Sequence, residues 1–175
     1  MDFIVISPAH VFTQESEMVN RLFDLGLSRY HLDKAQTSEQ VLAEILEKIE
    51  PRYLPRISLH SHFHLVLAYG VGGIHYSFEL KKGLDKELHD KVKLYQEFGI
   101  RVSMDISKCN EDFSPGNYAI LKGEDMPCSH ADIFPLDPPL QSNVSYLKIA
   151  LQQSLWDYDD PIERYEEIQL LFDIL

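Results

Sequence analysis

Residues 57–76 read ISLHSHFHLVLAYGVGGIHY and contain two short apolar runs on either side of a helical segment. We expect a strand over Arg56–His60, a short apolar helix over Phe63–Tyr69 that ends at Gly70, and a second strand over Gly73–Tyr76. A helix between two strands returns the chain to the same edge of the sheet, so the two strands run parallel. The segment therefore predicts a β-α-β unit.

The same alternation extends in both directions from this unit. Apolar runs separated by amphipathic segments recur from the N-terminus to residue 122. The strands of a parallel sheet read as continuous apolar runs, because helices cover both of its faces. We therefore predict one α/β domain with about six parallel strands. The predicted strands are residues 2–7, 27–32, 56–60, 73–76, 100–104 and 117–121, and the predicted helices are residues 15–25, 38–49, 63–69 and 84–98.

The last third of the chain has a different pattern. Residues 123–142 form a Pro-rich loop, and residues 143–175 carry two amphipathic patterns with apolar residues three and four positions apart. Pro161 stands at the first turn of the second pattern, after two Asp residues that suit a helix cap. We expect a single domain of residues 1–175, in which β/α units occupy residues 1–122 and two helices replace the final units.

The composition excludes several classes of function. The chain has 175 residues and a formal net charge of −12, and such acidity does not favour binding to phosphate backbones or anionic membranes. Residues 57–78 carry no Asp, Glu, Lys or Arg, but their His, Gly and Ser make insertion into a bilayer costly. Cys109 and Cys128 form neither a disulfide framework nor a zinc knuckle, and the N-terminus lacks a signal-peptide pattern. We expect a cytoplasmic protein without nucleic-acid or membrane partners.

The densest group of chemically active residues is the His-x-His-x-His run at residues 60–64. Residues two apart on a strand point to one side, so we expect His60 and His62 to face the same space, where neutral imidazoles bind Zn²⁺ or Fe²⁺. The alternative is that His64 begins a helix and points elsewhere, while the histidines of neighbouring strands bond to backbone. The sequence leaves both interpretations open.

Polar residues near other strand ends are candidates for ligand binding. Lys34 follows the second strand, Ser103 lies in the fifth and Lys122 follows the sixth. At the carboxyl ends of parallel strands these groups can meet a small ligand such as a phosphate. A lysine after a strand can equally end a loop in water. In either case we expect Lys34 to be exposed, so that its replacement changes stability little.

The order of these motifs resembles thiamine phosphate synthase and its relative, thiazole tautomerase, of the TenI-like family. The resemblance is carried by Phe3–Ser7, Tyr30–Lys34, residues 57–65 and Gly73–Tyr76, and a weaker similarity continues to Leu121. It implies a TIM-type (β/α) barrel that handles thiamin precursors. Full barrels generally need about 200 residues or more, so we expect this barrel to be incomplete or irregular in its second half.

The resemblance also implies which catalytic groups are missing. The synthase binds Mg²⁺ through Asp residues after its third and fourth strands, whereas this chain has His60-Ser61 at the first position and only Glu79 near the second. Lys34 matches a diphosphate-binding Lys of the family, but the accompanying Arg is absent. These losses imply weak or no synthase activity. The tautomerase needs no metal, and the resemblance places His75 as the proton carrier.

Three hypotheses for the function follow. The first is a diverged barrel protein of thiamin metabolism that binds a small phosphorylated or heteroaromatic ligand near Lys34, His60 and His75. The second is a His-x-His metal-dependent hydrolase, for which His60 and His62 are the candidate metal ligands. Glu79 is the candidate ligand that could replace a magnesium-binding Asp of the synthase. The cofactor stays open, because the family implies Mg²⁺ and the histidines suit Zn²⁺. The third is a non-enzymatic interaction protein, and a homodimer would cover the strand edges of an open barrel.

Overall fold

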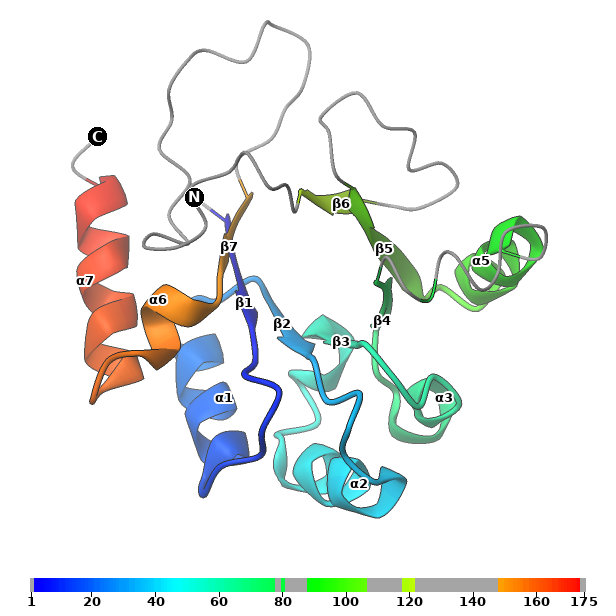
Figure 1. Cartoon of the computed structure of the whole chain (residues 1–175), viewed down its shortest axis with the longest axis horizontal. Helices are drawn as coiled ribbons and strands as arrows, with labels where there is room; N and C mark the ends of the chain where they lie inside the picture. The colour runs from blue at the N-terminus through cyan, green and yellow to red at the C-terminus, as the bar shows by residue number, and fades with distance from the viewer. Residues whose placement is uncertain (1, 78–79, 81–87, 107–117, 122–147, 174–175) are drawn as a thin grey trace, which may run out of the picture.

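The computed structural model of the chain describes residues 2–77, 80, 88–106, 118–121 and 148–173. Strands and helices alternate along most of this length (Figure 1). The strands are β1 (Asp2–Ile6), β2 (Arg29–Leu32), β3 (Ile57–Leu59), β4 (Gly73–Tyr76), β5 (Arg101–Ile106), β6 (Tyr118–Leu121) and β7 (Lys148–Leu151). The helices are α1 (Glu15–Asp24), α2 (Glu39–Lys48), α3 (Leu65–Tyr69), α5 (Leu88–Glu97), α6 (Gln153–Trp156) and α7 (Pro161–Asp173).

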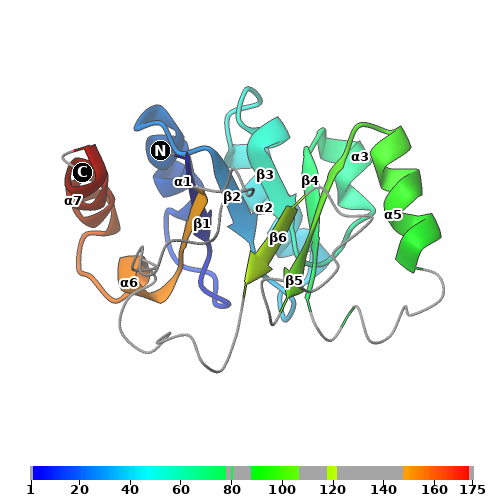
Figure 2. The ribbon, with the colours of Figure 1, turned by 90° about the horizontal axis from the view of Figure 1, so that it is seen from above.

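The strands form one parallel sheet of seven strands in the order β6-β5-β4-β3-β2-β1-β7. The sheet curls, and α1, α2, α3 and α5 lie on its outer side (Figures 1 and 2). Within the described residues β6 and β7 are the two edges of the sheet, so the barrel is incomplete. The predicted fold class, an incomplete TIM-type (β/α) barrel, is confirmed.

The helix predicted from residue 143 onward is wrong over Lys148–Leu151, which form β7 and pair in parallel with β1. The positions of Ala150 and Leu155 suit a helix, but a strand of four residues is too short to reveal its own periodicity. The edge of β1 offers backbone groups that need hydrogen-bond partners, and β7 supplies them. After β7 the chain ends in two helices, as predicted.

Local signals in the sequence place the helix ends. Ser38 caps α2, where its Oγ accepts a hydrogen bond from the Val41 amide at 3.4 Å. Gly70 ends α3 in the left-handed conformation, with φ of 70°, which glycine adopts without strain. Asp160 caps α7, where its Oδ1 accepts hydrogen bonds from two backbone amides of the first turn at 2.9 and 3.1 Å.

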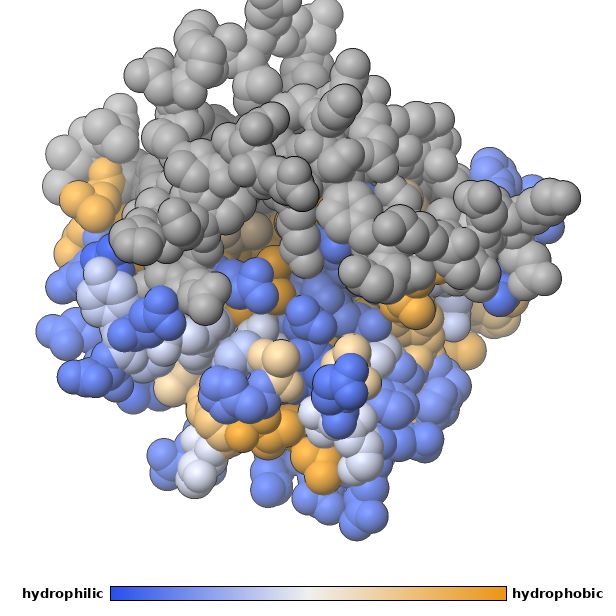
Figure 3. Space-filling model, in the orientation of Figure 1, coloured by the Kyte–Doolittle hydropathy of each residue, from blue (hydrophilic) through white to orange (hydrophobic). Residues whose placement is uncertain are grey.

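The hydrophobic core lies between the sheet and its outer helices. Alternate strand residues face this core, among them Tyr30, Leu32, Ile57, Leu59, Ile74, Tyr76, Val102 and Met104. The surface is mostly hydrophilic, with apolar patches over α7 and in other places (Figure 3). The exposed large apolar side chains include Leu67 of α3, Leu94 of α5, and Leu170 and Leu171 of α7. Among the described residues no helix has the length and apolar character needed to cross a membrane.

Candidate functional site in the barrel interior

The inner face of strands β2 to β5 carries polar residues. Side chains alternate along a strand, so the residues between the core positions point into the barrel. These inner residues are all buried: Arg29 and His31 of β2, Ser58 and His60 of β3 and its end, Gly73 and His75 of β4, and Ser103 and Asp105 of β5. Because branched apolar side chains normally fill a TIM barrel, the polar lining marks this interior as a candidate site.

Arg29 fills the amino-terminal part of the interior. Its guanidinium donates hydrogen bonds to Ile57 O at 3.2 Å, Ser58 Oγ at 3.0 Å and Pro55 O at 3.4 Å. A Cβ atom at Gly73 would lie 2.7 Å from Arg29 Nη1 and 2.4 Å from Ser58 Oγ. Gly73 therefore leaves the space in which the guanidinium crosses the barrel.

Three histidines meet on the carboxyl side of this layer. His31 Nδ1 lies 2.9 Å from His60 Nε2, and the His60 ring stacks on His75 with 4.2 Å between ring centroids. One ring nitrogen from each histidine lies within 4.8 Å of the other two. A hydrogen bond between two imidazoles needs one donor and one acceptor, so one of the two facing nitrogens presents a lone pair. The cluster can therefore hold a proton or a cation.

Asp105 and Ser103 hold the His75 ring from both sides. His75 Nδ1 lies 2.9 Å from Ser103 Oγ, and His75 Nε2 lies 3.0 Å from Asp105 Oδ1. Ser103 Oγ also lies 3.3 Å from Ile74 O, to which it can donate. A protonated ring donates at both nitrogens, whereas a ring with a lone pair at Nδ1 accepts from Ser103 instead. The ring can gain or lose a proton at Nδ1 without changing its place.

A second carboxylate lies behind His60. Asp33 Oδ1 is 3.5 Å from His60 Nδ1, and the Asp33 amide donates to Ser7 Oγ at 2.9 Å. The Asp33 side chain is 29% exposed, whereas that of His60 is 3% exposed. This carboxylate therefore lies between the buried cluster and solvent, and it favours the form of His60 whose Nε2 lone pair faces His31.

His62 does not join this cluster. β3 ends before His60, and His62 has a left-handed φ of 50°, from which its Nε2 donates to Thr37 O at 2.9 Å. The expectation that His60 and His62 face the same space is therefore wrong, because the chain has left the strand between them. His64 is exposed at the start of α3, as in the alternative interpretation.

Lys34 is buried, contrary to the expectation. Its Nζ lies 2.9 Å from Glu15 Oε1, 2.6 Å from Pro8 O and 2.7 Å from His10 O, which match the three hydrogens of an ammonium group. The Tyr30 hydroxyl donates to the same Glu15 oxygen at 3.5 Å. Lys34 thus joins β2 to α1 and to the loop after β1, and this geometry does not support contact with a ligand.

Burial controls the electrostatics around Lys34. Burial raises the pKa of Glu15, although the Lys34 charge opposes this shift, and burial lowers the pKa of Lys34 against the opposing effect of Glu15. Burial, reinforced by the Glu15 carboxylate, also raises the pKa of Tyr30. Both partners of the ion pair shift toward their neutral forms, so desolvation outweighs their attraction. Each charge therefore depends on the other to remain in the interior.

The structure brings together some of the predicted site residues. His60, His75 and Ser103 meet in the barrel interior. Glu79 and Lys122 lie outside the described residues, and their predicted roles stay predictions.

Two members of the interior site, His31 and Asp105, have no ligand-binding or catalytic role predicted from the sequence. The signal for them is the alternation of polar with apolar residues in the strands RYHL, GIHY and RVSMDI. In a barrel this period of two places every second side chain in the interior. The same pattern therefore marks His31 and Asp105 as inner residues once the barrel is assumed.

The comparisons with known proteins concern this fold. No protein-family model and no curated protein matches the sequence. Among solved structures, the chain is similar to thiamine phosphate pyrophosphorylase from Bacteroides thetaiotaomicron, with a TM-score of 0.72 and 18% sequence identity. The chain has the fold of that protein. The alignment covers 99% of this chain and 98% of that one, so the two share their short length. The resemblance predicted from the sequence is thus confirmed for the fold.

Proposed function

We propose that the chain binds a small phosphorylated or heteroaromatic ligand, of the class of thiamin precursors, in the carboxyl half of its barrel. We further propose that it acts on this ligand by proton transfer and not by the magnesium-dependent condensation of the synthase. The observation that carries this proposal is the buried group of His31, His60, His75, Ser103 and Asp105 on adjacent strands.

The position of the group supports a ligand site. TIM-type barrels keep their sites at the carboxyl ends of the strands, and His60 directly follows β3 while Asp105 lies near the end of β5. Burying polar groups costs desolvation free energy, whereas an apolar interior of the same shape needs no hydrogen bonds. A buried polar group of this size therefore indicates a function.

The described interior does not fit the Mg²⁺ ion of the synthase. Mg²⁺ prefers octahedral oxygen ligands, whereas the inner residues of β2, β3 and β4 present three imidazoles at this level. Lys34, which matches a diphosphate-binding residue of the family, has all its hydrogens bonded within the protein. This donor set supports the predicted weakness or loss of synthase activity.

His75 is the residue that we propose for proton transfer. Asp105 favours the protonated ring, and Ser103 can bond to the ring whether or not Nδ1 carries a proton. A carrier of this kind needs a fixed position and two available protonation states. The contacts of the His75 ring with Ser103 and Asp105 supply the fixed position and allow the two protonation states.

The proposed site can be tested by isothermal titration calorimetry with thiamin phosphate, thiazole phosphate and pyrophosphate. We expect at least one of these probes to bind, and we expect His60→Gln to weaken binding by about tenfold or more, the effect of one lost polar contact in a buried site. The matched control is His64→Gln, since His64 is exposed and outside the cluster. Absence of binding by all three probes, or equal weakening in both variants, would contradict the proposal.

The homodimer and the alternative of an interaction protein stay predictions. The described feature that favours them is the pair of exposed leucines on α7, Leu170 and Leu171. Exposed apolar side chains that belong to a contiguous patch are typical of interaction surfaces. The polar interior is independent of this surface.

A further inference from the structure

We infer that His31, His60 and His75 form a binding site for a zinc ion inside the barrel. The site differs from the metal site predicted from the sequence, since it omits His62 and takes its ligands from three different strands or strand ends. It goes beyond the proposed function, because it requires neither a thiamin-type ligand nor a proton-transfer reaction.

The distances between the ligand atoms suit zinc. In a tetrahedral site with Zn–N distances of about 2.0–2.1 Å, neighbouring ligand nitrogens lie about 3.3–3.4 Å apart. His31 Nδ1 and His60 Nε2 are 2.9 Å apart, already closer than a shared ion requires. The third nitrogen lies within 4.8 Å of both, so the rings need to close by at most about 1.5 Å. Rotation of side chains covers such a distance without a change in the strands.

Two carboxylates lie beside the outer ring nitrogens of histidines in the proposed zinc site. Histidines that bind a metal usually donate their second ring nitrogen to a carboxylate, which fixes the tautomer and increases the basicity of the ligating nitrogen. Asp33 lies 3.5 Å from His60 Nδ1, on the side opposite to the nitrogen that faces His31. Asp105 lies 3.0 Å from His75 Nε2, so the ligating atom would be Nδ1, which now bonds to Ser103 Oγ at 2.9 Å and would exchange that partner for the metal. Two of the three histidines thus have the supporting acid.

The charge and burial of the group also suit a cation. The three histidines and Asp105 are at most 5% exposed. A buried cation is stable only where anions and lone pairs replace its water, and here three imidazoles meet, with one carboxylate behind His60 and another behind His75. Three protein ligands leave a fourth position for water or for a ligand atom, as in zinc sites that act on substrates.

Zinc binding would give His75 a second role. In the metal-free protein its Nδ1 carries the proton proposed above, and in the zinc-bound protein the same nitrogen is a ligand. The two states exclude each other at this atom, so the zinc site and the proton-transfer function are tested by separate measurements.

The test uses the untagged full chain, zinc as the probe and a chromophoric chelator as competitor. We expect one zinc ion per chain after dialysis, and visible absorption of tetrahedral Co²⁺ when cobalt replaces it. His31→Gln should abolish stoichiometric binding, whereas His62→Gln should retain it. Because a buried substitution can impair folding, Asp33→Asn provides a second variant: this partly exposed residue acts through His60, and its loss should weaken zinc binding by about 10–100-fold while circular dichroism stays unchanged.

Zinc below about a tenth of an equivalent, or wild-type zinc affinity in a folded His31→Gln variant, would overturn the site. The calorimetric titration with thiamin-type probes is repeated in the presence of a chelator. Ligand binding without zinc binding would reject the zinc site and leave the proposed function standing. Zinc binding without ligand binding would support the zinc site and reject the proposed function.

Discussion

Replacing Lys34 with Met should destabilise the protein by about 3–5 kcal/mol, the usual effect of removing one partner of a buried ion pair. Lys34 and Glu15 are almost fully inaccessible, and the ammonium bonds to two backbone carbonyls as well as to the carboxylate. Without it, the Glu15 carboxylate must either stay buried without a counter-charge or take up a proton. Both cost free energy, because desolvation already raises the pKa of Glu15 while the pair is intact.

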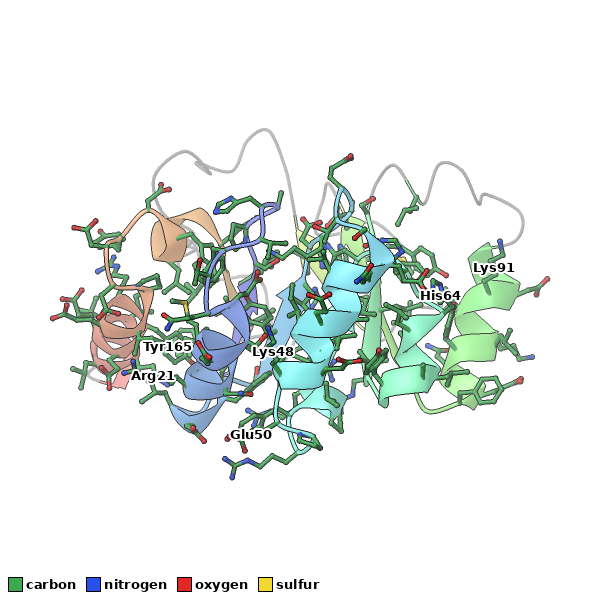
Figure 4. The ribbon with its side chains drawn as sticks, turned by 90° about the horizontal axis from the view of Figure 1, so that it is seen from below. Arg21, Lys48, Glu50, His64, Lys91 and Tyr165 are labelled. Carbon is green, nitrogen blue, oxygen red and sulfur yellow. The ribbon has the colours of Figure 1, made fainter. Side chains whose placement is uncertain are left out.

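Urea denaturation of three variants separates this effect from the loss of any lysine. The matched control is Lys48→Met, since Lys48 is exposed on α2 (Figure 4), and we expect it to change the free energy of unfolding by less than about 0.5 kcal/mol. The double variant Glu15→Leu/Lys34→Met should be more stable than Lys34→Met alone, because it leaves no unpaired charge. A Lys34→Met variant as stable as the control would show that the ion pair does not hold α1 to β2.

Replacing Asp105 with Asn should lower the rate of proton transfer to a bound ligand by about 10²–10⁴-fold, the range that a positioned acid or base contributes. An amide at this place carries no charge to stabilise a protonated His75, and its N–H₂ group can turn toward Nε2 and move the ring proton to Nδ1. Asp105 acts through His75 and is therefore a positioning residue. The loss should appear in kcat, with little change in KM.

Deuterium uptake from heavy water into thiazole phosphate measures this transfer directly, whatever product the reaction forms. The control is Asp159→Asn, because Asp159 is exposed in the turn before α7. Equal rates for wild type and Asp105→Asn would remove His75 as the proton carrier. A loss in both variants would point to a general effect of charge.

The strands up to β6 can be predicted from the sequence, because each is a short apolar run, and all but β6 stand next to an amphipathic helix pattern. β7 cannot, since Lys148–Leu151 is too short to show a period and its pairing with β1 depends on an edge at the other end of the chain. β7 differs from the earlier strands in that its place depends on a distant part of the chain. Local patterns identify local elements, but partners that are about 150 residues apart must be found in space.

The same limit applies to the site. His60, His75 and Ser103 can be found from their places on predicted strands, but their contacts depend on register, which pairs His75 with Ser103 across β4 and β5. The burial of Lys34 depends on Glu15 reaching it from the start of α1. Neither arrangement follows from spacing along the chain.

The most direct test of a ligand site in the barrel is a nuclear magnetic resonance titration of the protein with ¹⁵N-labelled histidine, using thiazole phosphate and thiamin phosphate as probes. We expect the ring resonances of His31, His60 and His75 to shift together as a probe binds, because these rings touch one another in the interior. His64, on the outside of the barrel (Figure 4), and His89 of α5 should not move. Shifts confined to the exposed histidines, or no shift at saturating probe, would contradict a ligand site in the barrel.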